Sequence, residues 1–203
     1  FLALADTEPD AWGRRVIARA HAKARAKDGS LAALTEADYL AGVDDLSRVG
    51  ALRLRDESGH YLRSVSKGEP PAPAFLELEK ILLASRAVED NNETAEDLTY
   101  LQGKATSLGG MRPKCTILDS DGALSLGKFP SVSDERSVTR AEVLALKLAQ
   151  LAGIDSAKAR IVMVQDQPVA MIRRFDRTPE QNRIPYISGA TLLQANREDE
   201  HSY

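Results

Sequence analysis

The 203-residue sequence is poor in several residue types, and each shortage removes a class of protein. One cysteine, Cys115, and three histidines allow no internal disulfide and no zinc-ligand spacing. No stretch approaches the roughly 18 continuous apolar residues of a membrane span, and the first residues lack the charged start and apolar run of a signal peptide. The formal net charge of -3 argues against a chain that acts as a whole as a nucleic-acid-binding surface. We therefore expect a cytoplasmic protein in a reducing compartment, with no membrane association.

Hydrophobic residues make up 43% of the chain, which is enough for one sizeable core or two modest ones. The sequence opens inside an apolar run without a methionine and stops at "EDEHSY" without a helix-ending signal. We therefore expect these residues to be a piece of a longer protein.

Residues 1–105 are predicted to form a helical module with one β-hairpin. Helices are expected over about 9–27, 35–42 and 74–88 and in the second half of 89–107, from apolar periodicity and start signals such as the capping-box spacing of Thr35 and Asp38. "GALRLRDESGHYLRS" alternates apolar and polar residues around a turn, which is typical of a hairpin. The proline-rich "KGEPPAPA" can continue neither a strand nor a helix, so we predict a connector there.

The pattern changes in residues 106–203, which we predict to be a second domain. Strands are expected over 114–118, 123–129, 159–164 and 169–175, with a helix over 139–152 between the second and third strands. The fold class is therefore α+β, with a β-β-α-β-β order in the C-terminal half.

A candidate phosphate site lies at the start of that half. Gly109 and Gly110 provide a turn of small residues, which lets backbone N–H groups approach phosphate oxygens. Lys128 falls in the same alternation class as Leu124 and Leu126, so its side chain is expected to point towards the face that those leucines help to bury. A lysine there needs an anion or must reach out to solvent, and Glu142 near the start of the next helix could provide that anion.

Simpler interpretations of the same residues stay open at this point. The loop satisfies neither G-x-G-x-x-G nor the P-loop pattern, and a Gly-Gly pair before a strand is often only a turn. In "IRRFDR" the simpler interpretation is a strand end with solvated arginines. Cys115 is expected to be a buried, inert thiol, and Trp12 is expected to pack on its own domain.

The strings "SLGGMRPK", "GKFPS", "RAEVLALKLAQLAGI" and "MIRRFDR", in this order and spacing, resemble the HipA-like serine/threonine kinases, which are toxin components of bacterial toxin–antitoxin modules. The upstream "DTEPDAWGRRVIARA" and the final "ATLLQANREDEHSY" also resemble that family. The resemblance therefore spans almost the whole chain, and it implies that 106–203 is the N-lobe of a protein kinase whose C-lobe is absent from this chain.

The resemblance also implies roles for particular residues. The phosphate-covering loop is formed by Gly109, Gly110, Met111, Arg112, Pro113 and Lys114. Lys128 pairs with the phosphates of ATP, Glu142 orients that lysine, and Ser107 is autophosphorylated. The strand edge that meets the adenine is Arg173, Arg174 and Phe175. Pro113 removes one potential phosphate donor from the loop, so the detail of the cradle stays open.

The family's catalytic string, of H-x-D-x-H-x-x-N type, does not occur in these 203 residues, so no catalytic residue and no metal ligand is assigned here. Its magnesium-binding aspartate is expected beyond Tyr203. The predicted function is thus an ATP- and Mg²⁺-dependent protein serine/threonine kinase toxin, with these residues alone inactive. The implied partners are a protein substrate and a DNA-binding antitoxin, with DNA contacted only through the antitoxin.

Two alternative functions remain. One is a module that docks an antitoxin or operator complex and has a vestigial nucleotide lobe. The other is a small-molecule kinase.

Overall fold

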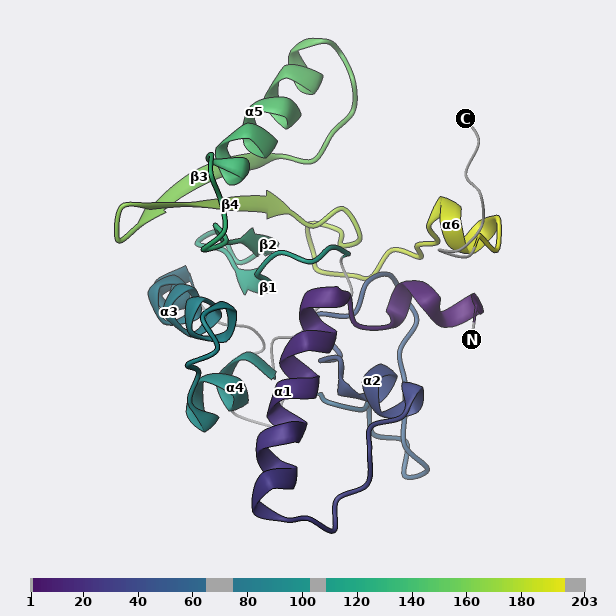
Figure 1. The fold of residues 1–203 in the computed structure, drawn as a ribbon. Coiled ribbons are helices and arrows are strands. Elements are labelled where there is room, and N and C mark those ends of the chain that lie inside the picture. The colour runs from purple at the N-terminus through teal and green to yellow at the C-terminus, as the bar shows by residue number, and fades with distance from the viewer. Residues whose placement is uncertain (1, 65–74, 103–108, 196–203) are drawn as a thin grey trace.

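The computed structural model describes residues 2–64, 75–102 and 109–195, and the fold is α+β. A four-stranded antiparallel sheet lies between α5 on one side and a layer of helices that includes α1, α3 and α4 on the other (Figure 1). In chain order the elements are η1 (Leu2–Thr7), α1 (Ala11–Lys27), α2 (Glu36–Gly42), η2 (Phe75–Glu77), α3 (Leu78–Glu89), α4 (Ala95–Gln102), β1 (Lys114–Leu118), β2 (Leu124–Lys128), α5 (Val138–Leu151), β3 (Ala159–Val164), β4 (Gln167–Arg173) and α6 (Gly189–Leu192).

The predicted helices of the N-terminal half are present, and two of them begin at side-chain caps. Asp10 accepts a hydrogen bond from the N–H of Gly13 at 2.8 Å and so caps α1. The capping box of Thr35 and Asp38 forms at the start of α2 as predicted, because both side chains satisfy N–H groups that have no partner within the helix. No helix in the described ranges has both the length and the apolar character needed to cross a membrane.

The predicted hairpin at 50–64 is wrong in its strands. The chain does reverse there, and the N–H of Leu62 donates to the carbonyl of Leu54 at 2.9 Å, but only one isolated bridge forms, between Arg55 and Tyr61. Leu52 is 53% exposed, so the alternating leucines do not face a core. A two-stranded ribbon without an apolar face to bury is only marginally stable. The predicted connector at 67–74 lies outside the described residues.

The four strands of the C-terminal half are confirmed, with the bounds of β2 and β4 shifted by one or two residues. Their order in the sheet is β1-β2-β4-β3, and every neighbouring pair is antiparallel. Gly127 allows the sheet to pack tightly, because a Cβ there would lie 2.3 Å from Cδ1 of Ile117. Ile117, which is fully buried, thus occupies the space that a larger residue at 127 would need.

One face of the sheet shares a hydrophobic core with the N-terminal helices. Cys115, Ile117, Phe129 and Met171 of the sheet segment belong to the same buried cluster as residues of α1, α3 and α4, among them Trp12. The predictions of a buried Cys115 and an inward-packed Trp12 are therefore confirmed. Because this core crosses the expected boundary near residue 105, the sheet depends on the N-terminal helices to cover it.

The opposite face carries Leu124, Leu126 and Lys128, and α5 packs over β3 and β4 on this side. Val143 of α5 is 4% exposed and holds the helix to the sheet. The outer side of α5 is apolar as well, since Leu144 and Leu148 are 57% and 55% exposed. Figure 1 shows α5 on the opposite side of the sheet from the helical layer.

A buried ion cluster ties the segment after β4 to the N-terminal half. The carboxylate of Asp176, which is fully buried, accepts hydrogen bonds from Arg174 and Arg177 at 2.6 Å and from the N–H of Gly50 at 2.8 Å. Burial alone would raise the pKa of Asp176, but the hydrogen bonds and charges of the two arginines outweigh it and hold this pKa below its ordinary value. The two guanidinium groups also donate to the carbonyl of Arg48 at 3.2 Å.

We predict that Asp176→Asn destabilises the protein by about 3–5 kcal/mol, because it keeps the shape of the side chain but leaves two buried guanidinium groups without their carboxylate. Asp121→Asn is the matched control: Asp121 pairs with Arg173 on the surface, where its side chain is 54% exposed, so its loss should cost less than about 1 kcal/mol. Urea unfolding of both variants measures the difference. Equal losses would mean that Asp176 does not support the buried arginines.

Candidate functional site

The structure brings Lys128 and Glu142 together. Lys128 is the last residue of β2, and its ammonium group forms an ion pair with the carboxylate of Glu142 in the second turn of α5. The side chains are 25% and 33% exposed, so the pair is accessible from solvent. α5 positions Glu142 because Val143, the next residue, is buried against the sheet.

A second lysine lies beside the first. Lys114 and Lys128 are directly opposite each other in the β1–β2 ladder, so their side chains leave the same face of the sheet. The side chain of Lys114 is only 2% exposed. Its ammonium nitrogen donates to the carbonyl of Gly110 at 2.9 Å and lies 3.5 Å from the carboxylate of Asp10, the residue that caps α1.

The two lysines and two carboxylates form a compact cluster with no net charge. Burial lowers the pKa of Lys114, and the charge of Lys128 lowers it further. The charge and hydrogen bond of Asp10 and the charge of Glu142 raise this pKa. Burial is the largest effect, so the pKa of Lys114 lies below its ordinary value. Burial therefore opposes the charge on Lys114, and the nearby carboxylates compensate for it only in part.

The loop before β1 is attached to its surroundings at both ends. Gly109 and Gly110 adopt φ values of 79° and 93°, a region that favours glycine. The carbonyl of Gly110 accepts from the N–H of Trp12 at 3.3 Å. Arg112 forms an ion pair with Asp134 in the segment that follows β2. These contacts attach the loop to the start of α1 and to the segment after β2.

The remaining predicted loop residues have different surroundings. Met111 is 81% exposed. The carbonyl of Pro113 accepts from the N–H of Phe129 at 3.0 Å, which joins the end of the loop to the residue after β2. Ser107 lies outside the described residues.

At the predicted adenine edge, Arg174 is not a solvated arginine and does not offer its guanidinium to a ligand. The side chain is 1% exposed and is bound to Asp176, and it also donates to Oγ1 of Thr116 at 3.1 Å. Its guanidinium is therefore bound inside the protein, so the interpretation of Arg174 as a solvated arginine is wrong. Only its backbone could face a nucleotide.

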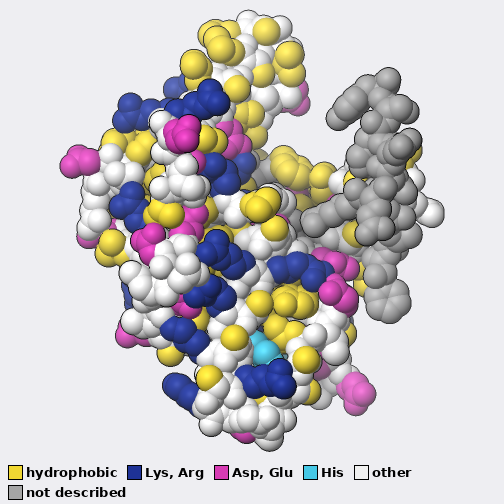
Figure 2. Space-filling view, in the orientation of Figure 1, with side chains coloured by type: hydrophobic (Ala, Val, Ile, Leu, Met, Phe, Trp, Pro, Cys, Tyr) yellow, Lys and Arg dark blue, Asp and Glu magenta, His cyan; other side chains and the backbone are white. Residues whose placement is uncertain are grey.

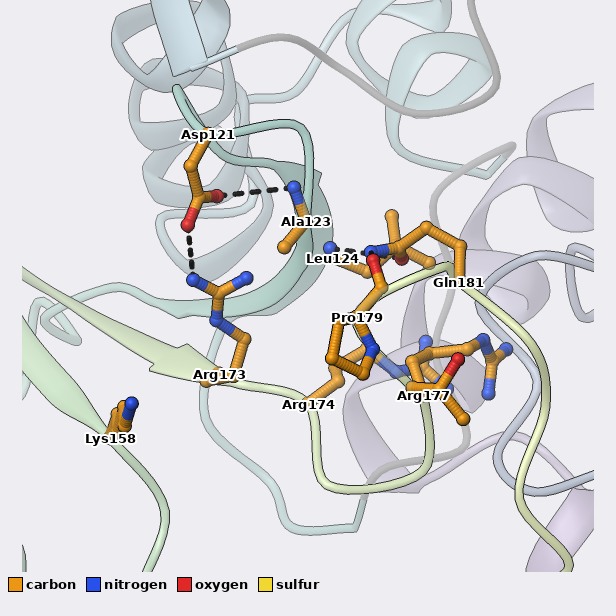
Figure 3. A pocket seen from close by; sticks show the side chains of 10 residues that line it. Asp121, Ala123, Leu124, Lys158, Arg173, Arg174, Arg177, Pro179 and Gln181 are labelled. Carbon is orange, nitrogen blue, oxygen red and sulfur yellow. Dashed lines mark hydrogen bonds and ion pairs between the residues drawn. The ribbon is translucent and has the colours of Figure 1, made fainter.

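The neighbours of Arg174 are more open. Arg173 forms an ion pair with Asp121 at the rim of a cavity of about 470 Å³, which Lys158 and Pro179 also line (Figure 3). Phe175 is 56% exposed, and its ring lies 5.0 Å from that of Tyr186, centroid to centroid. Within the described residues, the backbone N–H of Phe175 has no hydrogen-bond partner.

The lysine pair and this edge lie on the same strand pair but are well separated. Lys128 is opposite Ala170 and Ser125 is opposite Arg173, so the two places are about 10 Å apart at roughly 3.3 Å per residue. A nucleotide in an extended conformation separates its base from its terminal phosphates by a comparable length. The cavity beside Arg173 does not include Lys128.

Basic side chains gather along α1 in Figure 2, which raises the question of an anion-binding surface. The side chain of Glu93 is 3% exposed and forms ion pairs with Arg19 at 2.8 Å and with Lys23 at 3.8 Å. Part of this positive charge is therefore neutralised where α1 meets the start of α4, and it stabilises that contact.

The buried carboxylate of Asp44 has a structural role. Burial raises the pKa of Asp44 to about 6, but this carboxylate accepts a hydrogen bond from the N–H of Ser47 at 3.0 Å, as expected for an aspartate in a turn. Among the described residues, no cluster of three or more histidine, cysteine, aspartate and glutamate side chains is placed to hold a metal ion.

Sequence reasoning missed Asp10 and Asp134. "EPDAW" does indicate the cap of a helix at Asp10, but the second role of that carboxylate, beside Lys114, joins two residues that are far apart in the chain. Nothing in the local pattern carries that information. The ion pair of Asp134 with Arg112 likewise follows from the path of the loop and not from spacing.

Comparison with known proteins supports a HipA-like protein. Residues 106–203 match the family model described as HipA-like C-terminal domain. No curated protein matches the chain.

We predict that Gly110→Ala destabilises the protein by about 1–2 kcal/mol, because an alanine at a φ of 93° is strained whatever space surrounds it. Gly29→Ala is the matched control, since a Cβ at Gly29 would meet no other atom within 4 Å and the φ of Gly29 is not left-handed. This control should change the stability by less than about 0.5 kcal/mol. Urea unfolding compares the two. A harmless Gly110→Ala would show that the loop has no fixed conformation.

Proposed function

We propose that this HipA-like chain, whose residues 106–203 belong to the HipA-like C-terminal domain family, binds ATP as the N-lobe of a protein serine/threonine kinase. The family is generally a kinase family and is related to toxin–antitoxin modules. The observed order of β1, β2, α5, β3 and β4 supports an N-lobe of the protein-kinase type. The kinase would then be the toxin of such a module.

The observation that carries this proposal is the ion pair of Lys128 and Glu142 beside an anchored glycine loop. In protein kinases a strand lysine held by a helix glutamate binds the phosphates, and a glycine-rich loop covers them. Here β2 supplies the lysine, α5 the glutamate, and residues 109–113 the loop. Lys128 would position the phosphates and neutralise part of their charge; it is not a base.

The adenine would meet the edge of the sheet after β4. The N–H of Phe175 has no partner among the described residues, and a free backbone donor can bind a ring nitrogen. Phe175 itself offers an exposed aromatic ring beside that donor. The guanidinium of Arg174 has no part in this contact, because it is bound to Asp176.

Magnesium, when bound, bridges and neutralises the β- and γ-phosphates in enzymes of this kind. The described residues do not fit that ion, since they hold no cluster of carboxylates that could bind it. The sequence also lacks the family's H-x-D-x-H-x-x-N string. These 203 residues alone are therefore expected to bind ATP weakly at best and to transfer no phosphoryl group.

The partners follow from the family in the same way: a protein substrate and a DNA-binding antitoxin, with DNA contacted only through the antitoxin. Two other functions would use the same fold. In a docking module with a vestigial nucleotide lobe, ATP would not bind at Lys128. In a small-molecule kinase, ATP would bind but the acceptor would not be a protein hydroxyl.

We predict that Lys128→Met lowers the ATP affinity of the complete protein at least about tenfold without unfolding it, because methionine retains the packing of the stem and removes the charge. Glu142→Gln should have a smaller effect if other groups still hold the lysine. Lys147→Met, at an exposed position of α5, is the matched control. Calorimetric titration with ATP measures all three. An unchanged affinity in Lys128→Met would contradict the proposal and favour the docking module.

We also predict that phosphorylation of Ser107 weakens ATP binding, because about -1.5 to -2 charges would be added near the phosphate loop. The comparison uses the complete protein with Ser107 unmodified, phosphorylated and replaced by alanine. Mass spectrometry establishes the modification, and the ATP affinity of each form is the readout. Equal affinities in all three forms would leave Ser107 without a regulatory role.

A further inference from the structure

The start of α1 meets the candidate phosphate loop through two contacts, and a third contact, within the loop, links them. The N–H of Trp12 donates to the carbonyl of Gly110 at 3.3 Å. The ammonium group of Lys114 donates to the same carbonyl at 2.9 Å and lies 3.5 Å from the carboxylate of Asp10. Asp10 is 1% exposed at its side chain, so this junction is closed to solvent.

We propose that Asp10 is a positioning residue of the nucleotide site, which acts by holding Lys114 and, through it, the glycine loop against α1. The inference rests on the proposed function, since it assigns to the N-terminal half a part in binding ATP. Its basis is the geometry: one carboxylate caps α1 and also faces the lysine that follows the loop.

The physical reason is the cost of a buried lysine. Lys114 is nearly inaccessible, and an ammonium group in that position needs an anion nearby or it loses its proton or moves outward. The charged groups that face it are Asp10 from the cap of α1, Lys128 from β2 and Glu142 from α5. Since Glu142 is bound to Lys128, Asp10 is the carboxylate that compensates Lys114.

Loss of the Asp10 charge should therefore release the loop. With Asp10 neutral, the pKa of Lys114, which burial already lowers, falls further because its compensating charge is gone. The deprotonated amine would hold the Gly110 carbonyl less strongly. A lysine that stays charged would instead turn towards solvent and leave that carbonyl.

The decisive variant is Asp10→Asn. Asparagine caps a helix about as well as aspartate, so α1 should persist while the charge is removed. Asp28→Asn is the matched control: it makes the same change at the other end of α1, where the carboxylate accepts hydrogen bonds only locally, from Ser30. Lys114→Gln tests the other partner of the contact.

Hydrogen exchange of the Trp12 N–H, which donates to the carbonyl of Gly110, is the first measurement on the complete protein. We expect exchange to accelerate about tenfold or more in Asp10→Asn and in Lys114→Gln, and to stay unchanged in Asp28→Asn. ATP affinity from about pH 6 to about pH 9 is the second. The affinity of Asp10→Asn should be about tenfold weaker than that of the wild type. It should also fall at a lower pH than in the wild type, because loss of the Asp10 charge lowers the pKa of Lys114 further.

Unchanged exchange in Asp10→Asn overturns the inference, whatever happens to ATP binding. Faster exchange with unchanged ATP affinity overturns it as well, because the anchor would then be structural only. A failure of the proposed function is recognised separately: Lys128→Met would leave ATP affinity unaltered, although exchange of the Trp12 N–H would still respond to Asp10→Asn.

Discussion

The sheet of this protein cannot bury its own inner face, and the rest of the structure follows from that constraint. Four strands with a single helix on one side leave Cys115, Ile117 and Met171 uncovered on the other. The helices α1, α3 and α4 cover them and form one continuous core with them. A cavity in that core would be costly, so the N-terminal helices and the sheet are expected to fold together. The segment between α4 and β1 therefore connects two parts of one packed unit.

Charged groups at the edges of this core then have to be paired across the chain. Asp176 binds Arg174 and Arg177 and accepts from the N–H of Gly50, and Asp10 faces Lys114 from the start of α1. Both contacts join the N-terminal half to the C-terminal half. A buried charge without its partner is strongly destabilising, so these contacts select one arrangement of the two halves more sharply than the apolar core does.

The regular elements were predictable because their signals are local. The strands of the sheet alternate with period two, which also put Lys128 on the same face as Leu126. The prediction of a hairpin at 50–64 was wrong although apolar and polar residues alternate there in the same way. Alternation does not show whether a second layer is present to cover Leu52. The interpretation of Arg174 as a solvated arginine was wrong for a related reason: the pattern shows the face of the strand, but not that the segment around Arg48 packs over it. The contact of Asp10 with Lys114 was missed because it depends on the tertiary fold and not on a local pattern.

The neutral charge of the lysine cluster bears on how a polyphosphate could be held. Lys114 and Lys128 are balanced by Asp10 and Glu142, so the cluster offers no excess positive charge to attract an anion over a distance. The protein as a whole carries -3 and offers none either. Affinity for phosphate would have to come from geometry: backbone N–H groups of an anchored loop and a lysine already held in place, which lose little further freedom when the ligand binds. In such a site the residues that fix the loop contribute to phosphate affinity as much as those that touch the ligand. The contact between α1 and the glycine loop is therefore the part of this fold most closely tied to its proposed function.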